Sequence, residues 1–179
     1  MKELLQDCKN LDRKAQRKMV DYLTPFLFPI CLRYTDSRED AKDLMQESLI
    51  LIFNNLNSFA SDVEAPFRHW CRRITINKAF ERKRKKIVPI YSMKEKDENH
   101  PLIPSIHSKL NVDDILKLLD NLPHHHRNVF NLAVIDGYAH KEIAKLLEIK
   151  ESSSRTFLTR ARNLLQRLIR EENKVRSAN

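Results

Sequence analysis

The feature that most constrains the fold is the scarcity of glycine, because Gly137 is the single glycine among 179 residues. Stretches in which β-branched and polar residues alternate are also few, so we expect an all-α protein. The clearest helical pattern begins at this glycine and continues to Arg162. This stretch therefore gives the first expectation about what the chain does.

The stretch predicts two helices that meet at a tight turn. A first amphipathic helix is expected over His140–Leu147, where Ile143 and Leu147 share one face. The segment Glu148–Lys150 interrupts the pattern, and the three serines at 152–154 offer side-chain oxygens that can cap a second helix. The buried seam of the second helix is expected at Leu158, Ala161, Leu165 and Leu168.

The other side of the second helix is polar, with short hydroxyl donors and guanidinium groups. Such groups suit phosphate oxygens and base edges in a DNA major groove, so the stretch predicts a DNA-binding helix-turn-helix. The competing interpretation is an ordinary helical hairpin with a solvated basic face. Ala144 in the first helix and Ile149 at the turn favour the DNA-binding motif, because close packing of short helices needs a small residue and an apolar plug.

Charge and composition narrow the class of partner. The formal net charge of +9 favours a polyanionic partner, either nucleic acid or an anionic membrane surface. No apolar run approaches the roughly 20 residues of a membrane span, and the N-terminus has no secretory apolar core. We therefore expect no membrane insertion and a cytoplasmic location.

Neither cysteines nor histidines predict a metal, a cofactor or a disulfide framework. Cys8, Cys31 and Cys71 are odd in number and share no CxxC pair. Three histidines at 124–126 are adjacent, and adjacent helical residues point about 100° apart, so they cannot jointly face one ion. A solvated or DNA-facing helix start is expected there instead.

The N-terminal part predicts helices with an acidic surface. Over Lys2–Tyr34 we expect two helices with a break near Pro25 and Pro29. Ser37 can cap the next helix, with an aspartate at the capping-box position. The inward stripe of that helix is Ala41, Leu44, Met45, Ser48 and Ile52. Its acidic stripe is Asp40, Asp43 and Glu47, with Gln46 beside them. This stripe suggests a basic protein partner, and the alternative is a solvated helix face.

A polar loop at Asn57–Ala65 leads to the most basic part of the chain. Pro66 is well placed as the first residue of a helix that continues over Phe67–Lys86. Its expected core stripe is Phe67, Trp70, Cys71 and Ile74, with Ile76 and Phe80 on another side. Cations interleaved with aromatic rings suit a nucleic-acid strand with exposed bases. The alternative for Trp70 is simple core packing.

The segment Ile87–Leu110 contains three prolines and predicts a flexible linker between domains. A helical pattern returns at Asn111, and a later helix is expected to end at Gly137. The expected organisation is a first domain over 1–86, a linker over 87–110, a second domain over 111–172 and a tail over 173–179.

Three segments resemble bacterial RNA polymerase sigma factors of the extracytoplasmic-function type, the smallest members of the sigma-70 family. Two lie in the first half, DAKDLMQESLILIFNNLNSF (Asp40–Phe59) and FRHWCRRITINKAFERKRKK (Phe67–Lys86). The third is LPHHHRNVFNLAVIDGYAHKEIAKLLEIKESSSRTFLTRARNLLQRLI (Leu122–Ile169). The order of these segments, their spacing and several separate motifs all agree with the pattern of that family.

The resemblance implies two helical domains, called sigma-two and sigma-four, and an initiation factor with no catalysis of its own. The acidic helix would dock on the clamp helices of the largest subunit of core RNA polymerase through Asp40, Asp43, Gln46 and Glu47. The loop at Ser58–Ala65 would capture an extruded base of the minus-ten element, and the basic helix would grip promoter DNA. The implied minus-ten contacts are Ser58, Phe59, Trp70, Arg72, Arg73, Asn77, Arg82, Lys83 and Arg84. The helix-turn-helix would read the minus-thirty-five element through Ser152, Ser153, Arg155, Thr156 and Arg160. An anti-sigma factor is left open as a further partner.

The chain departs from the family pattern at the turn. Glu148 stands where many members have glycine, so a less left-handed backbone and a different helix angle are expected. Three serines replace a more usual small-Thr-Val pattern, and Lys150 is a poor cap, which leaves open the residue that starts the helix. Glu81 replaces a commoner aspartate, which is a mild change.

Two other classes of protein are alternatives to an initiation factor. A stand-alone helix-turn-helix regulator would bind duplex DNA without polymerase, but it leaves the acidic helix without a role. A DNA-processing enzyme would need a metal or nucleophile constellation, and no spaced His, Asp or Glu motif requires one. The enzyme hypothesis ranks last.

Overall fold

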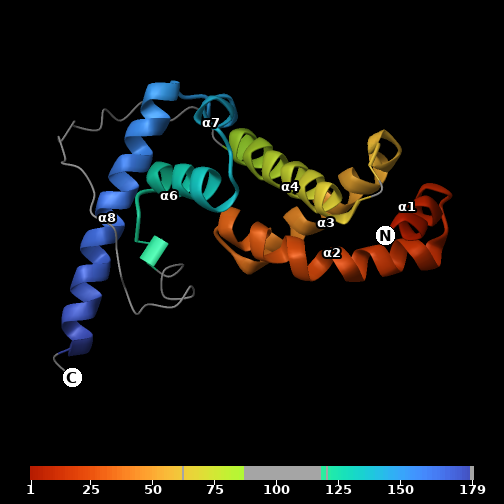
Figure 1. The fold of residues 1–179 in the computed structure, drawn as a ribbon, viewed down its shortest axis with the longest axis horizontal. Helices are drawn as coiled ribbons and strands as arrows, with labels where there is room; N and C mark the ends of the chain where they lie inside the picture. The colour runs from red at the N-terminus through yellow and green to blue at the C-terminus, as the bar shows by residue number, and fades with distance from the viewer. Residues whose placement is uncertain (62, 87–117, 120, 178–179) are drawn as a thin grey trace. The chain divides into compact units, whose positions relative to one another are not determined.

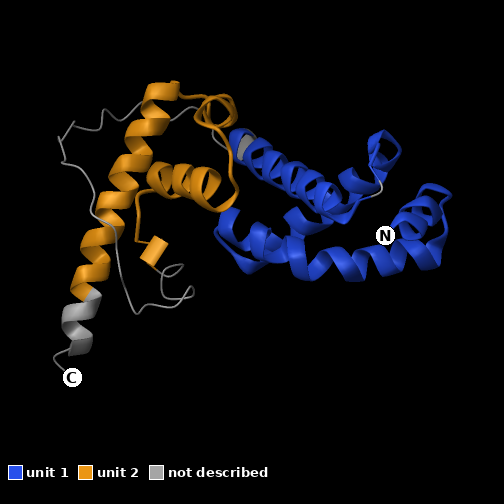
Figure 2. Ribbon diagram, viewed as in Figure 1, with its two compact units in different colours: residues 1–90 blue, residues 91–179 orange. Residues whose placement is uncertain are grey.

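The structure is a computed structural model, and it describes residues 1–179 apart from 62, 87–117, 120, 178 and 179 (Figure 1). The described residues form helices and no strand, which confirms the all-α prediction. The chain divides into two compact units, residues 1–90 and 91–179, shown in different colours in Figure 2. The predicted linker Ile87–Leu110 lies outside the described residues. In the described part, no helix has the length and apolar character needed to cross a bilayer.

The first unit begins with the helices α1 (Lys2–Lys9) and α2 (Arg13–Tyr34). Between them Leu11 has a left-handed φ of 64°, and Asp12 caps α2 by accepting a hydrogen bond from the Ala15 N–H at 2.7 Å. The chain therefore changes direction at Leu11, since an α-helix cannot continue through a residue with positive φ.

The predicted break near Pro25 and Pro29 is wrong, because α2 runs through both prolines. Each proline removes one backbone donor from the helix, which normally disfavours continuation. The buried face of α2 packs against α3 and α4, and this packing holds the helix together. That face consists of Ala15, Met19, Leu23, Leu27, Ile30, Cys31 and Tyr34.

Helix α3 (Arg38–Asn54) follows the sequence prediction closely. The Ser37 side chain accepts a hydrogen bond from the Asp40 N–H at 3.0 Å, so the predicted cap is confirmed. The predicted inward stripe is also confirmed, since its buried residues are Ala41, Leu44, Met45, Ser48 and Ile52. The short 3-10 helix η1 (Leu56–Ser58) follows.

Helix α4 (Glu64–Lys86) begins earlier than predicted. Pro66 is its third residue rather than its first, and it still lies in the first turn, where no N–H is needed for a helical bond. The helix is covered on more than one side, as expected, by burial of Phe67, Cys71, Thr75, Ile76, Ala79 and Phe80. Helices α2, α3 and α4 pack on one another and form the core of the first unit.

The three cysteines of the first unit are all free thiols and all buried. Burial raises the pKa of Cys8 to about 11 and the pKa values of Cys31 and Cys71 to about 12. Each thiol therefore stays protonated near neutral pH.

The second unit contains α6 (His124–Phe130), a π-helical turn η2 (Asn131–Ile135), α7 (His140–Leu147) and α8 (Glu151–Ser177). Both α6 and α7 pack on α8. Gly137 ends the η2 segment with φ +74°, as predicted for a helix terminator. The buried core residues include Leu119, Leu122, Val129, Leu132, Ile143, Leu158, Ala161, Leu165 and Ile169. Leu168, predicted in this seam, is only half-buried.

Candidate nucleic-acid and partner interfaces

The acidic stripe of α3 divides into two parts. Asp43 and Gln46 are exposed, whereas Asp40 faces α4. The Arg82 guanidinium lies 3.7 Å from the Asp40 carboxylate, and it also donates to the Asp40 carbonyl at 3.4 Å. Two predicted binding residues, one for a protein and one for DNA, therefore bind each other.

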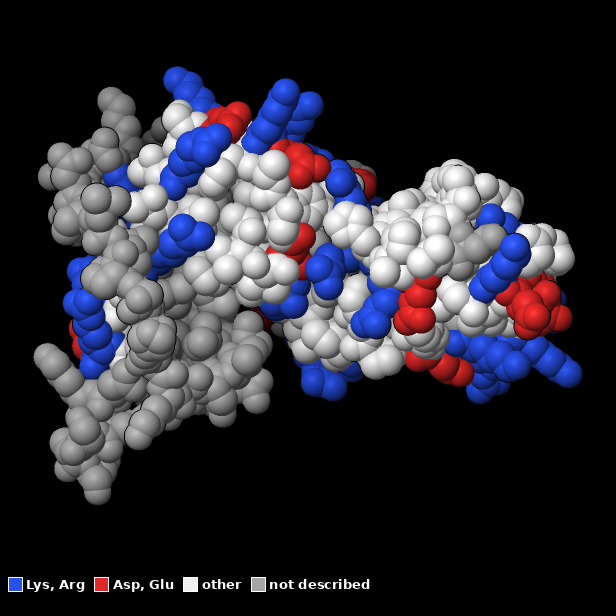
Figure 3. Space-filling model, viewed as in Figure 1, with Lys and Arg blue, Asp and Glu red and all other residues white. Residues whose placement is uncertain are grey.

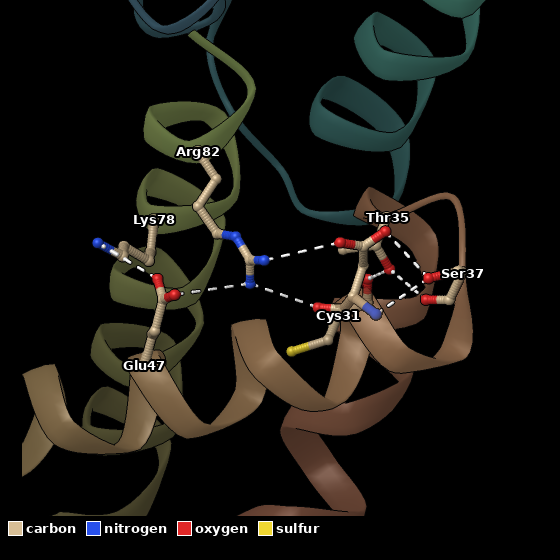
Figure 4. Close-up of polar contacts among 7 residues, drawn as sticks. Cys31, Thr35, Ser37, Glu47, Lys78 and Arg82 are labelled. Atoms are coloured by element: carbon tan, nitrogen blue, oxygen red, sulfur yellow. Dashed lines mark hydrogen bonds and ion pairs between the residues drawn. The ribbon is translucent and has the colours of Figure 1, made fainter. Parts of the chain in front are cut away.

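Glu47 is the second acidic residue that faces α4, and Figure 4 shows it between two cations. Its carboxylate lies 3.4 Å from the Lys78 ammonium and 3.9 Å from the Arg82 guanidinium. The Lys78 and Arg82 side chains are only 18% and 19% exposed, so water screens these pairs less than pairs on an open surface. Sequence reasoning missed Lys78, although its spacing of four from Arg82 places both on one face of α4.

The loop after η1 rests on an aromatic cluster. The Phe59 ring is 7% exposed and lies 5.3 Å from the Phe67 ring and 5.2 Å from the Trp70 ring, between centroids. The Phe59 carbonyl accepts a hydrogen bond from the Lys9 ammonium at 3.0 Å. Phe59, predicted to touch DNA, thus anchors the base of the loop, while Trp70 is half-buried beside it.

The remaining predicted minus-ten residues fall into two groups. Arg73, Asn77 and Arg84 are exposed, and their spacing on α4 places them within about 40° of one another around the helix. Arg72 and Lys83 are half-buried and lie over aromatic rings of this unit, Arg72 at 5.5 Å from the centre of Phe26 and Lys83 at 5.7 Å from Phe80.

Ser58 is exposed, but its hydroxyl donates to the Asn55 carbonyl at 2.7 Å. On the face drawn in Figure 3, acidic side chains lie beside several of the basic ones.

The predicted recognition residues lie at the start of α8. Ser152, Arg155 and Thr156 are exposed, and Ser153 and Arg160 are half-buried. Two of them make contacts within the helix, since Arg155 forms an ion pair with Glu151 at 2.6 Å and the Thr156 hydroxyl donates to the Ser152 carbonyl at 3.1 Å. The first three turns of α8 therefore carry all five predicted recognition residues on one continuous helix.

The serine cap predicted for α8 is wrong, because the helix begins at Glu151 and the three serines lie within its first turn. Ser154 is fully buried, and its hydroxyl lies 2.9 Å from His140 Nδ1 on α7. This contact, which the sequence did not predict, joins the two helices of the motif. Burial, followed by the charge of Arg155, lowers the pKa of His140.

The expectation for Glu148 is also wrong. Its backbone is left-handed, with φ 56° and ψ 40°, although glutamate has no intrinsic preference for that conformation. The Ile149 N–H donates to the Ala144 carbonyl at 3.0 Å, which closes the end of α7. Packing of α7 on α8 imposes the turn that glycine would adopt without strain.

The three histidines at the start of α6 differ in their exposure. His124 and His125 are exposed, as a solvated helix start predicts, but His126 is 6% exposed and its ring meets the Phe157 ring edge-on at 5.3 Å. The prediction of a solvated residue is therefore wrong for His126, which belongs to the α6–α8 interface. Among the described residues, no three His, Cys, Asp or Glu side chains come together as a metal ion requires.

A helix-turn-helix with a polar outer face, preceded in the chain by a basic helix that packs beside an acidic one, is typical of DNA-binding proteins. Comparison with known families agrees: residues 19–86 match the model for Sigma-70 region 2, and residues 113–165 match Sigma-70, region 4. The chain belongs to the sigma-70 family, and it is a sigma factor of the extracytoplasmic-function (ECF) type. Sigma factors are not enzymes; they bind core RNA polymerase and direct promoter recognition and DNA opening.

Two curated relatives carry that description. ECF RNA polymerase sigma factor SigW from Bacillus subtilis is 27% identical, over 96% of this chain and 97% of its own length. ECF RNA polymerase sigma factor SigE from Mycolicibacterium smegmatis is 26% identical, over 78% of this chain and 56% of its own length.

Two solved structures share the fold. CnrH, solved in complex with the cytosolic domain of CnrY, has a TM-score of 0.51 and 19% identity, covering 95% of this chain and 97% of its own. The sigma factor RpoE from Bartonella quintana, solved with the anti-sigma factor NepR, has a TM-score of 0.53 and 20% identity, covering 86% and 96%.

Proposed function

We propose that α3 docks on the clamp helices of the largest subunit of core RNA polymerase through its outward acidic edge. Asp43 and Gln46 make the direct contacts, because both are exposed on the side opposite the buried stripe. Glu47, with 43% of its side chain exposed, borders this surface while it binds Lys78. Asp40 contributes indirectly, because its carboxylate forms an ion pair with Arg82 of α4. The division of the acidic stripe is the observation that carries this proposal.

Promoter opening is proposed for the outward face of α4 and the loop before it. Arg73, Asn77 and Arg84 lie on one side of the helix and would follow the phosphates of a separated strand. Phe59 and Trp70 support the loop that receives the extruded base of the minus-ten element. The aromatic cluster is pre-formed, so the chain orders little more when the base enters.

The start of α8 is proposed to read the minus-thirty-five element in the major groove. Arg155 and Arg160 would contact phosphates or guanine edges, and Ser152, Ser153 and Thr156 would contact neighbouring phosphate oxygens. Two weak DNA contacts on one chain raise the effective concentration of each other, which gives promoter selectivity without a strong single site.

The docking proposal is tested by pull-down of the purified chain with bacterial core RNA polymerase. Asp43→Arg should abolish stoichiometric binding, because it places a cation on a surface that is expected to meet a basic partner. Asp21→Arg is the matched control, since Asp21 is also an exposed aspartate but lies on α2. Binding that survives Asp43→Arg would move the interface elsewhere, and tight binding to duplex DNA without polymerase would favour a stand-alone regulator.

We also propose that the chain acts in the cytoplasm, where core polymerase is found, and that an anti-sigma factor regulates it. RpoE from Bartonella quintana was solved with such a partner. Fractionation of cells tests the location, and co-purification with the tagged chain tests the anti-sigma partner. A pool of the chain that stays membrane-bound in the absence of any partner would contradict the cytoplasmic location.

A further inference from the structure

The loop after η1 is fixed at one residue by two different elements. The ring of Phe59 is held by Phe67 and Trp70 of α4, whereas its carbonyl oxygen accepts a hydrogen bond from Lys9 of α1 at 3.0 Å. The two contacts act on opposite ends of the residue, since one is made by the side chain and the other by the backbone. Together they fix both the position and the orientation of the peptide that begins the loop.

Lys9 is well placed for this role because α1 is itself firmly anchored. Leu5 and Cys8 of α1 are each 2% exposed, and the helix contacts both α2 and η1. Lys9 is the last residue of α1, and its side chain is partly buried where it reaches a carbonyl 50 positions away in the chain. A charged donor makes a stronger hydrogen bond than a neutral one, particularly when water is partly excluded.

We propose that Lys9 is a positioning residue for base selection, holding the loop that begins at Phe59 in the shape that receives the extruded minus-ten base. This inference rests on the function proposed above for that loop. Residues 2–9 precede the segment 19–86 that matches Sigma-70 region 2, so the family match assigns α1 no role. The contact between Lys9 and the Phe59 carbonyl gives α1 a role in positioning the loop.

The expected defect is a loss of selectivity rather than a loss of polymerase binding. Without the ammonium, the Phe59 carbonyl has lost its charged donor, so the loop samples more conformations and the Phe59 ring is held less firmly against Trp70. A pocket that must be ordered on binding discriminates less well between bases than one already formed. The exposed edge of α3 at Asp43 and Gln46 is untouched by this change.

Loop position can be measured without DNA or polymerase, because Trp70 is the only tryptophan in the chain and contacts Phe59. Lys9→Met keeps the aliphatic stem and removes the charge, so we expect a red shift of Trp70 emission and stronger quenching by acrylamide in the full-length protein. Lys9→Arg should behave as the unsubstituted chain, since guanidinium also donates. Lys14→Met is the matched control, because Lys14 is an exposed lysine in the first turn of α2.

Base selection is measured by transcription in vitro from a promoter library randomised at both elements, with core polymerase loaded with each variant. Lys9→Met should flatten the base preference at minus-ten positions by about threefold to tenfold, which is less than the full effect of one hydrogen bond from a charged donor because this contact is only partly buried. Preference at minus-thirty-five positions and the yield of holoenzyme should not change. Lys14→Met should alter neither preference.

Three results would overturn the inference. Unchanged Trp70 quenching in Lys9→Met would show that Lys9 does not position the loop. Stronger quenching with unchanged base preference would limit Lys9 to a structural contact. If the unsubstituted chain has no minus-ten preference, the proposed function of the loop itself fails and the inference falls with it. The Trp70 measurement separates this last case from the first.

Discussion

Helices α4 and α8 carry similar cations but hold them in different ways. On α4, Arg82 and Lys78 bind Asp40 and Glu47 of the neighbouring helix, and their side chains are less than one-fifth exposed. On α8, Arg155 is 64% exposed and its described partner, Glu151, belongs to the same helix. The first helix uses part of its positive charge to hold the fold, whereas the second presents its charge to solvent. The same substitution should therefore affect stability in one unit and DNA binding in the other.

The largest effect is expected from Phe67→Ala, which removes the ring beneath the loop of the first unit. Phe67 is fully buried, so truncation should lower the free energy of unfolding of this unit by about 3–5 kcal/mol. Urea denaturation followed by Trp70 fluorescence measures the change. Leu165→Ala is the control, since it should destabilise the second unit by about 2–5 kcal/mol and leave the Trp70 transition in place. A shift of that transition by Leu165→Ala would show that the units unfold together.

A pair of identical substitutions tests the comparison directly. Arg82→Met should destabilise the first unit by about 1–3 kcal/mol, because it leaves Asp40 and Glu47 without their shared, partly buried cation. Arg155→Met should change stability by less than about 0.5 kcal/mol, since exposed ion pairs contribute little. Urea denaturation of both variants gives these values.

DNA binding should show the reverse order for the same two variants. Arg155→Met should weaken binding to a minus-thirty-five duplex and lower the slope of log affinity against log salt by about one. Arg82→Met should leave that slope unchanged. If Arg82→Met weakens DNA binding without loss of stability, the ion pairs with α3 open when DNA binds.

A smaller effect of opposite sign is expected at the turn between α7 and α8. Glu148→Gly should stabilise the second unit by about 0.5–1 kcal/mol, because glycine adopts the left-handed conformation without steric cost, although it also gains entropy in the unfolded chain. Glu148→Ala is the control that removes the side chain and keeps the strain. Thermal unfolding measures both, and an equal gain in the two variants would assign the cost to the glutamate side chain instead.

The smallest effect concerns pH and His140. The pKa of His140 is lowered in the folded state by burial first and by Arg155 next, with Arg162 acting the same way and Glu151 against them. The unfolded state therefore binds the proton at higher pH, near the ordinary value of 6.5. The contribution to stability is complete above that value and is lost as the pH falls through the lowered pKa. Thermal unfolding between these limits should depend less on pH in His140→Gln, and an unchanged dependence would remove His140 as its source.

The sequence predicted features that depend on neighbouring residues in the chain. The inward stripe of α3, the bounds of α7 and the end of a helix at Gly137 all follow from periodicity or from one backbone preference. The same reasoning failed at Pro25 and Pro29, because local propensity disfavours a helix there while packing against two other helices maintains it.

The site residues, too, could be predicted only where a single segment of the chain determines them. The exposed residues of α8 were predicted because a helical face can be read from one segment. The pairing of Arg82 with Asp40, and of Ser154 with His140, joins residues 42 and 14 positions apart, and no periodicity specifies which side chains meet across two helices. Charge alone thus predicted that α3 and α4 bind partners, without indicating that they partly bind each other.

The distribution of thiols has a practical consequence. Every cysteine of the chain lies in the first unit and is buried, with a pKa of about 11 for Cys8 and about 12 for Cys31 and Cys71. The thiolate is the form that attacks an alkylating reagent, so these side chains become reactive only when the helices around them separate. A brief exposure to iodoacetamide, read by mass spectrometry, would therefore measure the fraction of molecules in which the first unit has opened, and it would not report on the second unit. Cysteine alkylation therefore reports on the opening of the first unit without any engineered label.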